Sequence, residues 1–185
     1  MVTIVVAYTA SDQTRTRPVT GSRSCTAIKA DRRYTQFDRS KTIPESREAS
    51  ARAARSGESF AFVVIDLDRF KQINDTYGHT AGDDVLLTVG SSLQTLTRAT
   101  DTVARIGGDE FVLLLEGIQK DKDLDRLRTD LSRIGSTSIP LKSGTEVLVG
   151  LSIGIAIYPD DTKSLEDLFS LADADMYSHK GKRIT

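Results

Sequence analysis

The pattern of apolar and polar positions changes along the chain near residue 50. Residues 9–50 show no sustained strand or helix periodicity and are rich in Thr, Ser, Arg and Asp. Because such a segment has little apolar surface to bury, residues 1–50 are predicted to be a poorly patterned tail or linker, with a helix over residues 46–56. Apolar positions recur regularly over residues 51–185, which are predicted to form one domain.

Strands and helices alternate in this second part. Continuous apolar runs predict strands over residues 60–67, 102–106, 111–115 and 147–157. Apolar residues three and four positions apart predict helices over residues 70–77, 80–96, 124–134 and 165–176, the second of them capped by Thr80. Gly107 and Gly108 separate two of the strands and mark a hairpin. A hairpin inside this alternation predicts an α+β fold, a ferredoxin-like or palm-type antiparallel sheet flanked by helices.

Composition and charge narrow the choice of function. The chain is 38% hydrophobic and 28% charged, and Cys25 is its only cysteine, which is typical of a soluble protein in a reducing compartment. The apolar run over residues 2–8 is too short to cross a bilayer, so we expect a cytoplasmic protein without a membrane segment. Residues 51–185 carry sixteen Lys and Arg against twenty-one Asp and Glu. Such an acidic domain is not built to coat nucleic acid, and it needs a cation to bind a smaller polyanion such as a nucleotide.

Two clusters of acids stand where the apolar runs end. Asp66 and Asp68 follow the first strand and precede Lys71, a pattern that suits Mg²⁺ and phosphate but also an ordinary solvated strand end. Asp109 and Glu110 lie at the tip of the hairpin, whose glycines can also be explained by a turn that needs positive φ. If the hairpin pairs beside the first strand, Asp109 approaches Asp66, and two like charges that close require a cation.

A third polar cluster comprises Asn74, His79 and Asp83. Asp83 follows Thr80 by three positions, so it can be the acid of a helix capping box, and His79 can be a plain turn residue. Alternatively, an ionised Asp accepts hydrogen bonds only, so it suits the N1–H and amine of guanine and rejects adenine.

The spacing of these clusters resembles that of the GGDEF diguanylate cyclase family. The resemblance covers about residues 56–183 and rests on Asp66-x-Asp68-x-Phe70-Lys71-x-x-Asn74-Asp75-x-x-Gly78-His79-x-x-Gly82-Asp83, Arg105-x-Gly107-Gly108-Asp109-Glu110-Phe111, Ser152-Ile-Gly-Ile-Ala156 and Ala172-Asp173-x-x-Met176-Tyr177.

The resemblance implies a role for each matching position. Metal ligands are expected to be Asp66 and Asp109, with the backbone carbonyl of Leu67. Asp109 is also expected to help deprotonate the ribose 3′-hydroxyl, and Lys71 to stabilise charge on the phosphates. The remaining substrate-binding residues implied are Asn74, His79, Asp83, Gly108 and Lys180.

The reaction implied is the condensation of two GTP into cyclic di-GMP and two pyrophosphates. Each domain is expected to bind one GTP with two Mg²⁺, for which Mn²⁺ can substitute, and two domains form a homodimer for turnover. Arg98 and Asp101 match the RxxD element that binds product and inhibits many family members; otherwise they are an ordinary surface ion pair.

Two other functions stay open. The basic pair near the C-terminus matches only at Lys180, with the second cation out of register, which favours a weak or inactive domain that binds GTP or cyclic di-GMP as a signalling module. The other alternative is a palm-type enzyme that acts on another nucleotide. Asn74 and Asp83 count against it, because they favour guanine.

Overall fold

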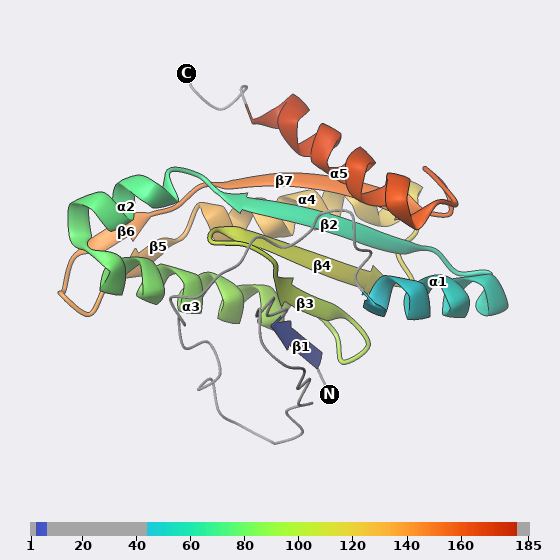
Figure 1. Ribbon diagram of the computed structural model, residues 1–185, viewed down its shortest axis with the longest axis horizontal. Coiled ribbons are helices and arrows are strands. Elements are labelled where there is room, and N and C mark those ends of the chain that lie inside the picture. The colour runs from blue at the N-terminus through green and yellow to red at the C-terminus, as the bar shows by residue number, and fades with distance from the viewer. Residues whose placement is uncertain (1–2, 7–43, 181–185) are drawn as a thin grey trace, which may run out of the picture.

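The computed structural model describes residues 3–6 and 44–180, in which seven strands and five helices alternate (Figure 1). The strands are β1 (Thr3–Val6), β2 (Phe60–Leu67), β3 (Thr102–Arg105), β4 (Glu110–Glu116), β5 (Ser138–Pro140), β6 (Glu146–Leu148) and β7 (Leu151–Tyr158). The helices are α1 (Pro44–Ser56), α2 (Phe70–Tyr77), α3 (His79–Leu96), α4 (Lys120–Gly135) and α5 (Leu165–His179).

Strand β2 is paired on both sides within the main sheet. The strand order is β1-β3-β4-β2-β7, and every pair is antiparallel except β1 with β3. The polar end of β2 is held on both sides, because Asp66 lies opposite Glu110 of β4 and opposite Ser152 of β7. The predicted α+β fold, with the 107–110 hairpin beside the first strand, is confirmed.

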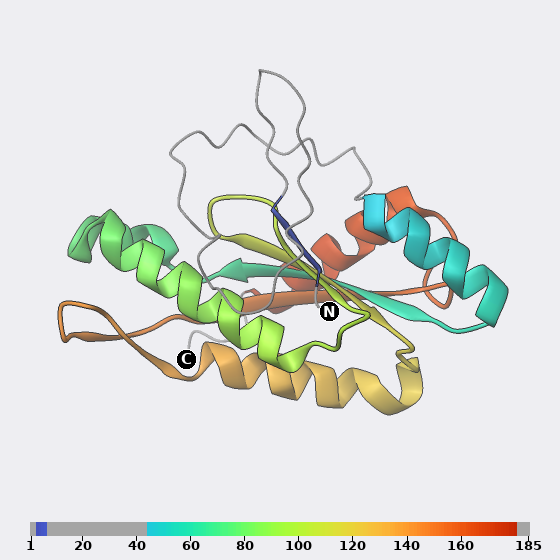
Figure 2. The same cartoon turned by 90° about the horizontal axis from the view of Figure 1, so that it is seen from below.

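Helices cover both faces of this sheet. Because side chains of a strand alternate between faces, successive residues of β2 enter two separate cores. One core packs under α3 and α4, which run along the same side of the sheet in Figure 2, and the other under α1 and α5. Leu93 and Leu131 anchor the first core and Leu168 the second, and burying each such side chain contributes about 1.5–3 kcal/mol.

Gly154 sets how closely α5 packs against the sheet. A Cβ at this position would overlap the carbonyl oxygen of Ala172 and lie 2.7 Å from Cβ of Met176. The absence of a side chain therefore lets the helix backbone rest directly on β7.

Two predicted boundaries are wrong. The strand predicted over residues 147–157 is two strands, because the chain leaves β6, which pairs with β5 in a separate hairpin, before it enters β7 at Leu151. Thr80 does not cap a helix: α3 begins at His79 after Gly78, and no side chain caps it. Gly78, with φ of 82°, makes the abrupt change of direction that joins α2 to α3 without a linker.

Part of the predicted tail is structured. Helix α1 contains the helix expected over residues 46–56, and Arg52 on it binds Glu116 of β4 through Nε at 3.1 Å and a terminal nitrogen. Strand β1 adds a parallel edge to β3, which the sequence pattern did not predict. Residues 7–43 lie outside the described part of the chain, and the division at residue 50 stays a prediction. No helix in the described part is both long and apolar enough to cross a membrane.

Asp101 is buried at the junction between α3 and β3. Its side chain belongs to a residue that is only 5% exposed, and its two carboxylate oxygens accept hydrogen bonds from the backbone N–H of Arg98 at 2.7 Å and of Glu116 at 3.1 Å. The carboxylate thus joins the end of the helix to the end of β4. A buried charge is tolerated here because both oxygens have donors.

We predict that Asp101→Ala lowers the free energy of unfolding by about 2 kcal/mol or more, because it leaves two backbone donors without their acceptors. Chemical denaturation measures this change. Arg98→Ala is the matched control at an exposed position and should change stability by less than about 0.5 kcal/mol. Equal losses in the two variants would contradict the role assigned to Asp101.

Candidate functional site

Asp66 and Asp109 come together because β2 and β4 are antiparallel. Asp66 is the cross-strand partner of Glu110, and the next pair is closed by a hydrogen bond from Leu67 N–H to the carbonyl oxygen of Asp109 at 3.1 Å. The backbone therefore brings the acid at the end of β2 beside the acid at the hairpin tip, as expected from the sequence.

The proximity of the two carboxylates affects the pKa of Asp109. Burial, together with the negative charge of Asp66, raises the pKa of Asp109 above its ordinary value, although Lys180 and Arg105 act in the opposite direction. The Lys180 ammonium lies 2.9 Å from Oδ1 of Asp66. Partial burial opposes the charge of this ammonium, but the hydrogen bond to Asp66 and the negative charges nearby together outweigh that cost and raise the pKa of Lys180. The carboxylates thus form a site that already attracts a cation.

These residues fit a magnesium ion. Two carboxylates and the Leu67 carbonyl are hard oxygen donors of the kind that Mg²⁺ prefers, and a divalent cation relieves the repulsion that raises the pKa of Asp109. In the described part of the chain, no group of three or more His, Cys, Asp or Glu residues is placed to hold a metal. A bound ion would therefore need further oxygens from water or from a ligand, as Mg²⁺ does when it binds together with phosphates.

The hairpin glycines are not explained by turn geometry alone. Neither Gly107 nor Gly108 has positive φ, in contrast to the glycines that end other elements of the described chain. Gly108 is exposed, and a Cβ added there would meet no atom within 4 Å. Gly108 consequently leaves open space at the hairpin tip, in which a ligand can approach the backbone closely.

Arg105 fixes the shape of this hairpin, a role that the sequence reasoning did not assign. Its Nε donates to the carbonyl oxygen of Gly107 at 3.1 Å, and a terminal guanidinium nitrogen donates to that of Gly108 at 2.9 Å. Both carbonyls are therefore held toward Arg105. The arginine two positions before the glycines was the sequence signal for this clamp.

Lys71 lies in the first turn of α2 just after the metal-site residues. The turn between β2 and α2 contains Arg69 in the left-handed region, with φ of 58°. Lys71 is exposed, so its ammonium is available to a ligand. The N-terminus of a helix also offers backbone N–H groups, which suit phosphate oxygens.

The third cluster is formed by the close packing of α2 on α3. A Cβ on Gly82 would overlap Oδ1 of Asn74 and lie 2.9 Å from its Cγ, so the missing side chain of Gly82 leaves room for Asn74. Asp83 follows on the same helix and is half-buried, and His79 is exposed at its start. Since no side chain caps α3, the capping-box explanation of Asp83 is excluded. In the described part of the chain, the Asn74 and Asp83 side chains make no hydrogen bond to protein.

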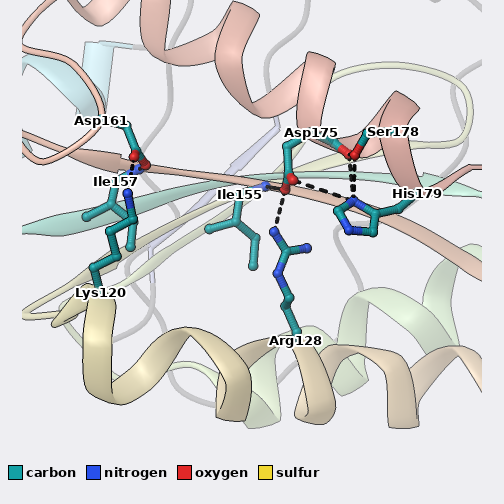
Figure 3. Close-up of polar contacts among 8 residues, drawn as sticks. All are labelled: Lys120, Arg128, Ile155, Ile157, Asp161, Asp175, Ser178 and His179. Carbon is teal, nitrogen blue, oxygen red and sulfur yellow. Dashed lines mark hydrogen bonds and ion pairs between the residues drawn. The ribbon is translucent and has the colours of Figure 1, made fainter.

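Lys180 reaches Asp66 from the end of α5. Figure 3 shows how Asp175 holds that end in place. Oδ2 of Asp175 accepts from Ile155 N–H of β7 at 2.8 Å and from Arg128 of α4 at 2.6 Å, and His179 also contacts Asp175. Figure 3 shows a second bridge of the same kind, in which Asp161 accepts from Ile157 N–H and pairs with Lys120. The sequence reasoning missed both acids, because spacing alone does not show which acids face the free edge of β7.

Arg98 and Asp101 do not form the exposed pair expected from the sequence. Arg98 is exposed, whereas Asp101 is buried and its oxygens accept from the backbone N–H groups described above. The alternative interpretation as an ordinary surface ion pair is wrong, because Asp101 is buried. Asp101 forms the turn that presents Arg98.

Known proteins are similar to the chain over this region. The family described as diguanylate cyclase, GGDEF domain, matches residues 37–184. The bifunctional diguanylate cyclase/cyclic di-GMP phosphodiesterase MucR of Pseudomonas aeruginosa is 42% identical over 133 residues, which are 72% of this chain and 19% of MucR. Diguanylate cyclase TpbB of the same species is 40% identical over 131 residues, 71% of this chain and 30% of TpbB. The chain thus spans less than a third of the length of either relative.

Solved structures agree with this assignment. The GGDEF domain of TpbB from P. aeruginosa is 35% identical with a TM-score of 0.70, covering 79% of this chain and 88% of that one. The GGDEF domain of DgcB from Caulobacter crescentus, solved in complex with c-di-GMP, is 28% identical with a TM-score of 0.66, covering 74% of this chain and 78% of that one. The chain belongs to the GGDEF diguanylate cyclase family.

Proposed function

We propose that the chain is an active diguanylate cyclase that condenses two GTP into cyclic di-GMP and two pyrophosphates. The observation that carries this proposal is the proximity of Asp66 and Asp109 where β2 meets β4, beside the open hairpin tip at Gly108. Two adjacent carboxylates at a site that also offers Lys71 and Lys180 can bind a metal–triphosphate and little else of comparable charge.

The chain's own residues position the reactants. Asp66, Asp109 and the Leu67 carbonyl would hold Mg²⁺, which would supply positive charge to the phosphates. Lys71 binds phosphate oxygens from the start of α2 and stabilises the charge that develops on them. Asp109, at the tip of the hairpin beside the site, is assigned to assist removal of the proton from the ribose 3′-hydroxyl. Lys180 then exchanges its contact with Asp66 for a phosphate.

Guanine selectivity is assigned to the α2–α3 cluster. The Asn74 and Asp83 side chains present acceptors and an amide without hydrogen-bond partners in the described protein, and Asp83 as a carboxylate accepts from guanine N1–H and the exocyclic amine. Adenine offers an acceptor at N1, so it leaves the carboxylate unpaired. His79, exposed at the start of α3, completes the base and ribose end of the site.

One chain supplies one nucleotide half-site. Cyclisation needs the 3′-hydroxyl of each GTP in line with the α-phosphate of the other, so two domains must face each other in a homodimer. The dimer is a proposal that rests on the chemistry of a symmetric product. A domain that binds GTP or cyclic di-GMP without turnover is the alternative, and the first experiment below distinguishes it.

We predict Mg²⁺-dependent conversion of GTP, and not ATP, to cyclic di-GMP, at a rate that rises faster than linearly with enzyme concentration because two half-sites must meet. Chromatography of the products measures it. Asp109→Ala should lower turnover roughly a thousandfold, since it removes a metal ligand together with the assistance to deprotonation. GTP binding without any product from the unmodified chain would favour the non-catalytic alternative.

Gly82→Ala tests the guanine site without altering a metal ligand. The new Cβ displaces the Asn74 side chain, so we expect the KM for GTP to rise roughly tenfold while kcat at saturating GTP falls much less. Steady-state kinetics separate the two constants. Ser91→Ala, an exposed position on the same helix, is the control and should leave both unchanged. A KM for GTP that stays at the wild-type value in Gly82→Ala contradicts the assignment of Asn74.

Product inhibition is proposed to act through exposed Arg98. A guanidinium can donate a bidentate pair to guanine O6 and N7 or bind a phosphate, so Arg98→Ala should weaken cyclic di-GMP binding roughly tenfold or more. Initial rates at low product should stay close to wild type. Calorimetry with cyclic di-GMP measures the affinity, and Arg126→Ala, an exposed arginine on α4, is the control. Equal affinities for wild type and Arg98→Ala would remove the inhibitory site.

A further inference from the structure

Asp68, the second acid of the first cluster, lies opposite a glycine. The pairing of β2 with β7 places Asp66 against Ser152 and Leu67 against Leu151. It continues one residue beyond β2, because Asp68 N–H donates to the Gly150 carbonyl oxygen at 2.8 Å. Asp68 therefore stands over a position that has no side chain.

The Asp68 carboxylate occupies the space that Gly150 leaves. A Cβ on Gly150 would overlap Oδ2 of Asp68 and lie 3.2 Å from its Cβ and its Cγ. From this position Oδ1 of Asp68 accepts a hydrogen bond of 2.6 Å from the hydroxyl of Ser152, a residue that is only 8% exposed. Oδ1 of Asp68 is thus bound to β7, and Oδ2 lies over the residue that precedes β7.

The surroundings of Asp68 differ from those of the two proposed metal ligands. Asp68 lines a cavity of about 430 Å³ together with Ser152, Arg128, His179 and Lys180, at the edge of β7 between α4 and the end of α5. Neither Asp66 nor Asp109 lines this cavity, although Lys180 also pairs with Asp66. The Asp68 side chain is therefore directed to the β7 edge.

The turn that follows Asp68 needs such an anchor. Arg69 has φ of 58°, a left-handed conformation that costs a non-glycine residue free energy and persists only where neighbouring contacts hold it. Asp68 is the residue immediately before this turn, and Lys71 is the second residue of α2 after it. The contacts of Asp68 with Gly150 and Ser152 thus fix the chain at a point between Asp66 and Lys71.

We propose that Asp68 is a positioning residue for residues 66–71, acting through Ser152 and Gly150, and that it is not a ligand of the metal. The inference rests on the proposed cyclase function, because positioning matters there for the metal and the phosphates. It divides the two acids of the Asp66-x-Asp68 pair into one that binds the cation and one that binds the neighbouring strand.

Conservative substitution separates the two roles. Asp68→Asn keeps an Oδ1 acceptor for the Ser152 hydroxyl but is a poor metal ligand. We expect it to retain wild-type Mn²⁺ affinity, measured by electron paramagnetic resonance with GTP present, and kcat within about threefold of wild type. Asp68→Ala should lower kcat roughly ten- to a hundredfold, because the loop is no longer held. Asp66→Asn is the control and should lose Mn²⁺ binding. Loss of Mn²⁺ binding in Asp68→Asn overturns the proposal.

Ser152→Ala provides the second arm, since the Ser152 hydroxyl donates to Asp68 and Ser152 is not itself a proposed metal ligand. Ser152→Ala should lower kcat, as Asp68→Ala does. The double variant should be no slower than Asp68→Ala alone, because the two substitutions remove the same hydrogen bond. Additive losses would contradict the link. If the unmodified chain makes no cyclic di-GMP, the cyclase proposal fails, whereas the Mn²⁺ affinities of Asp66→Asn and Asp68→Asn still decide the role of Asp68. Melting temperatures of all variants identify any that fail to fold.

Discussion

The antiparallel pairing of β2 with β4 is the constraint on which the site depends. Backbone hydrogen bonds along this pair fix the register in which Asp66 meets Glu110, and the hydrogen bond from Leu67 to Asp109 closes it. Two carboxylates would not approach each other on flexible loops, because burial and like charge raise the pKa of Asp109. A buried sheet of apolar strands supplies the free energy that holds them together.

Two kinds of residue arrange the rest of the site around Asp66 and Asp109. Glycines leave space for neighbouring groups, and polar side chains form hydrogen bonds with main-chain groups. Gly82 leaves room for Asn74, Gly150 for Asp68, and Gly154 for the helix that carries Lys180. Arg105 and Asp101 bind main-chain groups at the two ends of β3. Close approach and backbone binding together give a rigid frame, and rigidity is what a reaction controlled by positioning requires.

Periodicity predicted the elements well because each one buries an apolar face. Strand β2 and helix α2 have the predicted bounds, and the expected faces of α4 and α5 lie in the two cores. Polar residues were harder to predict, since their partners are distant in sequence. Asp101 belongs to a motif that favoured an exposed residue, yet its oxygens bind the N–H groups of Arg98 and Glu116. Asp161 and Asp175 gave no signal, because only the tertiary fold places them at the β7 edge. The roles of the site residues stay predictions, although the structure brings Asp66, Asp109 and Lys180 together.

Lys180 forms an ion pair with Asp66 in the ligand-free protein. Its ammonium neutralises part of the charge of Asp66, so the carboxylate pair is tolerated before a metal binds. A metal held by Asp66, as proposed, would displace this ammonium, and the displaced cation would stay close because α5 is tied to β7 and α4 through Asp175. It would then be well placed for the negative charge of a triphosphate. Under the proposed function, the same residue would stabilise the site without a ligand and favour the combined entry of metal and nucleotide over the entry of metal alone.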